Sequence, residues 1–293
     1  GTTPRVWRAI RCRKGRTIRQ FLRSAPVRDL GDLGRDLAFR WRSLARVSAP
    51  PWKRVAGNWD GVEAGVDPKG LERLRRLRAQ HGDTMAAWPR ILTTSELREA
   101  AYVLDLLQEV GVASPRPFGP SLDVGSKNGS NLPAFVTFAS GPWDLVEIDA
   151  HRRYASLSTR RAHGERVARA YPGCRFIAGS VLDLRGPYAT VTWILPFVDP
   201  APHVAWGLPT RLFEPVRLLT HVRDLVTPGG TLIVVNQGDV ERDLQGSLFL
   251  ECAMQARSIG KVRSPLTPFR RPRYAWRWDR PLSDVHSGHV DET

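Results

Sequence analysis

The sequence contains little cysteine and little lysine, and it has no long apolar run. Cys12, Cys174 and Cys252 are far apart and share no metal-type spacing, which excludes a disulfide framework and favours a reduced, cytoplasmic protein. No stretch of about 18 apolar residues occurs, so the sequence predicts no membrane span. A charged and then apolar secretory leader is also missing. The composition, 42% hydrophobic and 25% charged over 293 residues, is that of a soluble globular protein.

The positive charge is concentrated near the N-terminal end. Residues 1–54 hold 15 Lys or Arg against three Asp, a net charge of +12, whereas residues 95–293 hold 23 against 21 acidic residues, a net charge of +2. Such a segment attracts phosphate-rich partners, either nucleic acid or an anionic membrane surface. Only five of the 44 basic residues are Lys, however, and a GC-rich genome also produces an arginine bias. A plain solvated surface therefore remains the alternative.

The chain divides into three predicted segments. Residues 1–92 form a basic, mainly helical extension or lid, residues 93–284 form the main domain, and residues 285–293 form a disordered tail. Apolar residues interleaved with Arg predict short basic helices before Pro50 and Pro51. The stretch "DPKGLERLRRLRAQHG" predicts an exposed amphipathic helix that ends at Gly82. His286 and His289 lie in the tail without a carboxylate or thiol framework, so no metal site is predicted.

From Thr93 onward, strand and helix patterns alternate. Thr93 and Glu96 form a capping box for a helix that continues to Gly111. Further helices are expected after Ser130 and over 151–170, 212–225 and 239–256. Seven strand-length runs surround them: "SLDV", "WDLVEID", "RFIAG", "ATVTWIL", "TLIVVN", "KVRSP" and "RYAWRW". This alternation predicts an α/β fold with a doubly wound, mostly parallel, seven-stranded sheet and helices on both faces. In "RYAWRW", alternation puts the aromatic residues on one face and favours a buried sheet face.

The stretch "LDVGSKNGSN", residues 122–131, is the strongest local signal. Gly125 and Gly129 follow the first strand, where a backbone without Cβ atoms can turn tightly and approach a ligand. The following helix offers free N–H groups and a positive dipole end to an anion. Asp123 can accept from backbone N–H groups or from a ligand amine. About twenty residues later, Glu147 and Asp149 end the second strand, where a carboxylate can bind both hydroxyls of a ribose.

These motifs resemble those of the class I S-adenosylmethionine-dependent methyltransferases, over about residues 95–280. "LDVGSKNGS" is similar to the family's first motif, which holds the methionine end of the cofactor, and "LVEID" is similar to its ribose-binding motif. The resemblance implies a Rossmann-like fold whose last two strands form an antiparallel hairpin. It also implies that S-adenosylmethionine is the cofactor. Nicotinamide is disfavoured because the glycine pattern is not GxGxxG.

The resemblance also implies which residues bind this cofactor. The turn departs from the family pattern, because Lys127 and Asn128 replace the usual middle glycine; Lys127 either pairs with the cofactor carboxylate or points to solvent. At the adenine position Ser180 replaces the common acid, which leaves the Val181 backbone or Asp183 as the contact. The complete predicted set is Asp123, Gly125, Lys127, Gly129, Glu147, Asp149, Ser180, Val181 and Asp183.

The fourth strand leads into "ILPFVDPAPHVAWGLP", residues 194–209, which the resemblance makes the substrate-facing loop. Asp199 and His203 are candidate general bases, and Phe197 and Trp206 are candidates to stack on a flat substrate. Pro196 in this loop and Asn236 after the fifth strand complete the predicted substrate contacts. "LPF" is similar to the signature of amino-group methyltransferases, but Leu195 replaces its polar residue.

The resemblance implies in-line methyl transfer from S-adenosylmethionine to a small or medium-sized metabolite. Two alternatives stay open. The first is a nucleic-acid methyltransferase that uses the Arg-rich N-terminal arm to bind phosphates. The second is a scaffold protein that retains the fold without turnover.

Overall fold

The structure of the protein, a computed structural model, describes residues 29–44, 56–111, 119–267, 269 and 271–282. The predicted tail with His286 and His289, and the basic residues 1–28 and 45–55, lie outside the described residues. Within the described part, no helix is both long enough and apolar enough to cross a bilayer.

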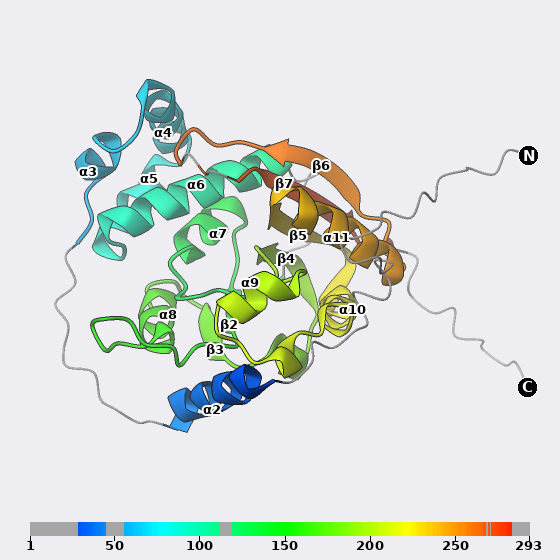
Figure 1. Cartoon of the computed structure of the whole chain (residues 1–293). Coiled ribbons are helices and arrows are strands. Elements are labelled where there is room, and N and C mark those ends of the chain that lie inside the picture. Colours follow the sequence, from blue (N-terminus) through cyan, green and yellow to red (C-terminus); the bar gives the residue numbers. More distant parts are fainter. Residues whose placement is uncertain (1–28, 45–55, 112–118, 268, 270, 283–293) are drawn as a thin grey trace, which may run out of the picture.

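A seven-stranded sheet forms the centre of the molecule (Figure 1). Its spatial order is β3 (Arg175–Ala178), β2 (Trp143–Glu147), β1 (Ser121–Val124), β4 (Tyr188–Ile194), β5 (Val226–Gln237), β7 (Arg273–Asp279) and β6 (Arg257–Val262). The first five strands are parallel, whereas β7 runs antiparallel to both β5 and β6. The predicted α/β fold with its antiparallel end is therefore confirmed.

Helices cover both faces of this sheet. One face packs against α3 (Trp59–Glu63), α4 (Pro68–Gln80), α5 (Gly82–Ala86), η1 (Trp88–Arg90), α6 (Thr94–Val110), α7 (Leu132–Phe138) and α8 (Arg160–Ala168). The other face packs against α10 (Pro215–Leu225) and α11 (Gly238–Glu251). Alternate residues of β5 enter the two cores: Ile233 and Val235 lie in the first, and Leu232 and Val234 in the second. This alternation is what a strand buried on both faces requires.

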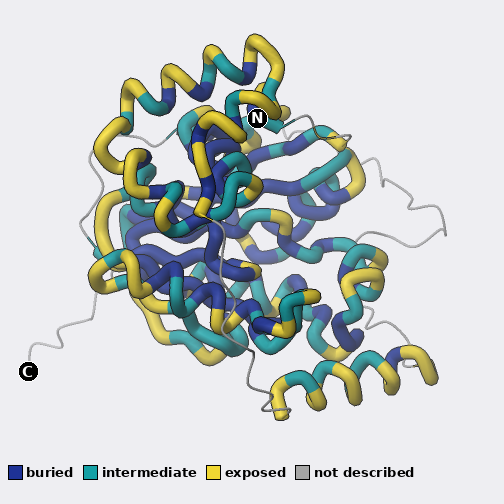
Figure 2. Tube along the Cα trace, turned by 90° about the vertical axis from the view of Figure 1, so that its left-hand side faces the viewer, coloured by how far each residue is buried: buried dark blue, intermediate teal, exposed yellow. Residues whose placement is uncertain are grey.

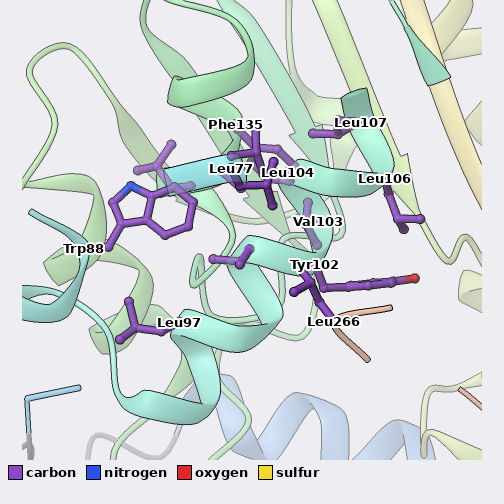
Figure 3. Packing of buried hydrophobic residues seen from close by; sticks show 14 of the residues in the cluster. Leu77, Trp88, Leu97, Tyr102, Val103, Leu104, Leu106, Leu107, Phe135 and Leu266 are labelled. Atoms are coloured by element: carbon purple, nitrogen blue, oxygen red, sulfur yellow. The ribbon is translucent and has the colours of Figure 1, made fainter. Parts of the chain in front are cut away.

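The first core extends beyond the predicted main domain. Leu77 of α4 and Trp88 of η1 are fully buried with Leu97 and Leu104 of α6 and Phe135 of α7 (Figure 3). Burying each such side chain contributes about 1.5–3 kcal/mol. The boundary expected at residue 92 therefore separates residues that share one hydrophobic core. Among the described helices of the predicted 1–92 extension, α2 (Leu30–Leu44) is the one that lies outside both clusters.

Helix α6 begins and ends as the sequence predicts. The backbone N–H of Thr93 donates to the Glu96 carboxylate at 2.9 Å, and the expected capping box is present. The C-terminal end falls at Gly111, whose φ of 66° suits glycine.

Two local predictions were wrong. The helix expected over 151–170 begins only at Arg160, because Thr159 accepts from the Ala162 N–H at 3.1 Å as its N-cap, and Leu157 before it has a φ of 63°. In β7 the arginine face is the more buried one: Arg273 and Arg277 are buried, whereas of the aromatic residues only Trp278 is buried and Tyr274 and Trp276 are half-buried. Arg277 binds Asp279 and the Gly111 carbonyl, and Arg273 binds Gln237. Satisfied hydrogen bonds offset the cost of burying these guanidinium groups.

The short helix α9 (Pro200–Ala205) and the turns η2 (Val181–Asp183) and η3 (Thr210–Leu212) lie in the loops after β3 and β4. Helix α2 lies at the lower edge of the molecule, next to the end of the sheet that carries β3 (Figure 1). These elements surround the region into which the carboxyl ends of β1, β2 and β4 open.

Candidate functional site

A cavity of about 510 Å³ lies at the carboxyl ends of β1, β2 and β4, where parallel α/β sheets bind ligands. Two sides of it differ in origin. The turn wall lies at the ends of β1, β2 and β3: Glu147 is the last residue of β2, and Gly125, Lys127, Ser180 and Val181 follow β1 and β3. The aromatic wall consists of Phe197, His203, Trp206, Phe213 and Glu241, which come from the segment after β4 and from α11.

The turn after β1 has three left-handed residues. Gly125, Lys127 and Gly129 have φ values of 76°, 54° and 71°. A Cβ on Gly129 would lie 3.2 Å from the Gly164 Cα of α8, so this glycine lets the turn approach that helix closely. Lys127 takes a conformation that costs an L-residue about 1–2 kcal/mol, so it occupies a glycine-type position without being glycine.

Glu147 is the central carboxylate of the turn wall. One of its oxygens accepts from the Lys127 N–H at 2.7 Å and the other from the Asp149 N–H at 2.8 Å, and Arg160 lies 3.6 Å away. Burial raises the pKa of Glu147, while the Arg160 guanidinium and these N–H groups oppose that rise. A carboxylate has about four acceptor sites, so after the two N–H bonds Glu147 keeps acceptor capacity on a cavity-lining residue.

The Asp149 carboxylate binds arginine side chains and does not line the cavity. It is buried, and its carboxylate accepts from Arg152, from Arg42 of α2 at 3.2 Å and from Arg160 at 3.5 Å. Arg152 also donates to the Trp206 carbonyl. The guanidinium groups of Arg152 and Arg160 lie 5.3 and 5.1 Å from the Trp206 ring centroid, within cation–π range. Asp149 therefore joins α2, α8 and the aromatic wall at the cavity rim.

His203 is buried between two aromatic rings. Its ring lies 5.4 Å from the Phe197 and Phe213 ring centroids, close to edge-on. Nε2 lies 2.9 Å from the Pro209 carbonyl oxygen, and because a carbonyl only accepts, Nε2 carries the proton. Burial lowers the pKa of His203, with the Pro209 bond opposing it. Burial therefore favours the neutral imidazole with Nδ1 unprotonated, which is the form that a general base requires.

Glu241 adds a second titratable group to the aromatic wall. Its side chain is buried and accepts from the Gln237 N–H at 3.0 Å. Burial raises the pKa of Glu241, while the Gln237 hydrogen bonds oppose that rise. Apolar residues including Leu208, Leu212 and Leu218 line the same part of the cavity. Burial in these apolar surroundings therefore favours the protonated, uncharged form of the Glu241 carboxyl.

The structure brings many of the predicted site residues together around the cavity. Those among its lining residues are Gly125, Lys127, Glu147, Ser180, Val181, Pro196, Phe197, His203 and Trp206. The Lys127 ammonium lies 3.4 Å from the Glu99 carboxylate of α6. The sequence had offered two positions for this side chain, at the cofactor carboxylate or in solvent, and the contact with Glu99 is a third one.

Other predicted residues are not part of this lining. Asp199 caps α9 by accepting from the Ala201 N–H at 2.9 Å, and Asp183 is exposed in η2. Asn236 is fully buried and donates to Gln245 at 3.4 Å. Asp149 and Gly129 have the rim and packing positions described above.

Asp123 lies beneath the turn, 4% exposed, and accepts from the Thr192 hydroxyl at 2.8 Å. Burial raises the pKa of Asp123 to about 7, against the hydrogen bonds from Ser126 and Thr192. Burial therefore favours the protonated, uncharged form of the Asp123 carboxyl beneath the turn.

Arg160, Phe213 and Glu241 are cavity residues that the sequence reasoning missed. Arg160 was placed inside a long helix, although Thr159 gives a local N-cap signal for a start at this residue. Phe213 and Glu241 lie 16 and 44 residues after Phe197 along the chain, and no spacing motif connects them. Within the described residues, no group of three His, Cys, Asp or Glu side chains is arranged to hold a metal ion.

No protein-family model matches the chain, and no curated protein matches its sequence. Solved structures do match. A SAM-dependent methyltransferase of Leishmania major has a TM-score of 0.45 at 14% identity, covering 67% of this chain and 82% of its own. A methyltransferase from Pyrococcus furiosus has a TM-score of 0.43 at 14% identity, covering 63% and 83%. The [4+2]-cyclase SpnF has a TM-score of 0.44 at 11% identity, also covering 63% and 83%.

These similarities are too low to indicate a reaction or a substrate, and one of the three proteins is named as a cyclase. The strand order and the antiparallel β7 decide the fold. It is the class I methyltransferase fold. In it, the glycine turn follows β1 and Glu147 is the last residue of β2.

Proposed function

We propose that the protein is an S-adenosylmethionine-dependent methyltransferase that acts on a small or medium-sized, largely apolar metabolite. The observation that carries this proposal is the single cavity that joins the turn wall to the aromatic wall. A methyltransferase needs both reactants in one enclosed space, because in-line transfer depends on holding the acceptor atom and the methyl group in line.

The residues present fit this cofactor. Glu147 keeps acceptor capacity for the ribose hydroxyls, and the Cβ position of Gly125 has no protein atom within 4 Å, which leaves room beside the turn for the methionine end. Val181 and Leu182 line the cavity and would provide apolar contacts for the adenine. When bound, the cofactor supplies an electrophilic methyl group on a sulfonium.

The chain's own contribution is to position the acceptor and remove its proton. Phe197, Phe213 and Trp206 exclude water and favour a flat or apolar acceptor. His203, with its proton fixed on Nε2 by the Pro209 carbonyl, takes the proton of an acceptor hydroxyl or amine at Nδ1. Glu241 lies on the same wall and is the alternative base.

The test is a methyl-transfer assay with methyl-labelled S-adenosylmethionine and a panel of small aromatic and apolar alcohols, phenols and amines. The intact protein is expected to form S-adenosylhomocysteine with a subset of the panel. His203→Gln should lower kcat by about 10²–10⁴-fold while cofactor binding is unchanged. RNA and DNA form separate arms of the assay, and turnover with nucleic acid alone would overturn the metabolite proposal.

A further inference from the structure

Helix α2, Leu30–Leu44, has two chemically different faces. Asp32, Asp36, Phe39 and Arg42 recur every three or four residues and face the body of the protein. A second, apolar set also recurs every three or four residues, at other positions of the helix: Leu30, Leu33, Leu37, Trp41 and Leu44. At about 100° per residue the two sets lie on roughly opposite sides of the helix.

The polar face is the one that contacts the body. The buried Asp32 carboxylate accepts from the Thr210 N–H at 2.7 Å and from the Thr210 hydroxyl at 2.5 Å. Asp36 pairs with Arg211 at 2.7 Å, and Arg42 pairs with Asp149 at 3.2 Å. Surface helices normally bury their apolar stripe, so α2 is oriented the opposite way from an ordinary amphipathic helix.

The apolar face points away from the protein. Leu30, Leu33, Leu37, Trp41 and Leu44 are 87%, 54%, 69%, 70% and 73% exposed. Figure 2 shows the exposed residues along this helix at the lower edge of the molecule. A contiguous apolar surface of this kind on a folded protein marks an interaction site.

The segments that flank α2 in the sequence are positively charged. In sequence, residues 1–28 hold nine basic and no acidic residues, and residues 45–55 hold three basic and no acidic residues. The acids of this region, Asp29, Asp32 and Asp36, all lie in the first half of α2 or just before it, and the last two are engaged by Thr210 and Arg211. Arg40, 63% exposed beside the apolar stripe, pairs with Asp36 at 2.9 Å, so the net positive charge comes from the two flanking segments. An exposed apolar stripe between basic, acid-free segments is the chemistry of an interfacial membrane helix.

We propose that the Leu30, Leu33, Leu37, Trp41 and Leu44 face of α2 docks onto an anionic lipid bilayer surface. Fifteen residues span about 22 Å along the helix axis, which suits a helix lying in the interface and not one crossing it. Nucleic acid fits less well, because phosphate binding needs cations and no apolar stripe. A second copy of the chain fits less well too, since pairing would bring together two segments of net charge +12.

The test is flotation of the full chain with phosphatidylcholine vesicles that contain or lack phosphatidylglycerol. The intact protein is expected to float with the anionic vesicles, to remain unbound with the neutral ones, and to be released by high salt. Leu33→Gln, Leu37→Gln and Trp41→Gln together should weaken binding about a hundredfold. A matched control is Val240→Gln with Leu250→Gln, two exposed apolar residues of α11, which should bind as the intact protein does.

Circular dichroism and size-exclusion mass measurement accompany both variants. Unchanged folding and mass in the α2 variant, with lost flotation, support the proposal. Equal binding by the intact protein and the α2 variant would overturn it, as would no flotation of the intact protein. A fall in oligomeric mass would identify a second copy as the occupant, and a fall in the melting temperature would identify a segment of the same chain; either result overturns the proposal.

Discussion

The two walls of the cavity use different means to place their side chains. The turn wall takes its residues from the strand ends and the turns that directly follow them, and backbone N–H groups fix its central carboxylate, Glu147. The aromatic wall gathers Phe197, His203, Phe213 and Glu241 from α9, the loops around it and α11, and ring contacts fix its histidine. The turn wall depends on the sheet, and one sheet architecture can serve many different reactions. The aromatic wall depends on loops, where the residues that select a substrate usually lie.

Of the changes that test the difference between the two walls, the largest effect on stability is expected at Asp123, the buried acid beneath the turn wall. Burial raises the pKa of Asp123 from 3.8 to about 7. Between these two pH values the folded state therefore binds more protons than the unfolded state. The free energy of unfolding consequently falls as the pH rises from about 4 to about 7. Asp123→Asn removes this loss. The variant's advantage in unfolding free energy should grow by about 2–4 kcal/mol between about pH 4 and pH 7, as measured by urea unfolding. A constant difference across this range would contradict the raised pKa.

The next effect concerns helix α2, which contacts Asp149 and Thr210. Asp32→Ala leaves the buried Thr210 N–H without its acceptor, which costs about 2–3 kcal/mol. Hydrogen exchange over α2 should accelerate by about 30- to 150-fold while the sheet amides keep their protection. Asp36→Ala is the matched control, since its more exposed pair with Arg211 contributes about 1 kcal/mol or less. Equal acceleration by both variants would show that Asp32 does not anchor the helix.

The smallest effect concerns the strained turn residue. Lys127→Gly removes a left-handed L-residue and should stabilise the fold by about 0.5–1 kcal/mol after the added unfolded-state entropy is counted. Lys127→Ala is the control: it removes the ammonium but keeps the Cβ, so it should change little. Thermal unfolding measures both. A destabilised Gly variant would show that the Glu99 contact matters more than the backbone conformation.

The sequence was sufficient for the fold and for most of the turn wall because both depend on local signals. Apolar runs define β1 to β5, and Gly125 with Glu147 follows from turn chemistry and strand spacing. The first turn of α8 was misplaced, because the Leu157 backbone and the Thr159 cap override a continuous helical pattern. For the same reason Arg160 was not predicted as a cavity residue.

The aromatic wall was only partly predictable because its members meet through tertiary packing. His203 and Phe197 came from the family position of one loop, but Glu241 lies on a different element and has no motif of its own. Asp199 was a candidate base by type, and only the structure reveals that its carboxylate caps α9. The orientation of α2 was equally inaccessible, since periodicity identifies an apolar stripe but not the side that faces the protein.

Calorimetric titration is the direct test of whether the turn wall binds S-adenosylmethionine through Glu147. The intact protein should bind S-adenosylmethionine and S-adenosylhomocysteine with micromolar affinity. Glu147→Ala should weaken both by about a hundredfold or more, because two charge-assisted hydrogen bonds are lost, whereas Glu241→Gln on the aromatic wall should leave both unchanged. No binding by the folded, intact protein, or equal binding by the Glu147→Ala variant, would contradict the account.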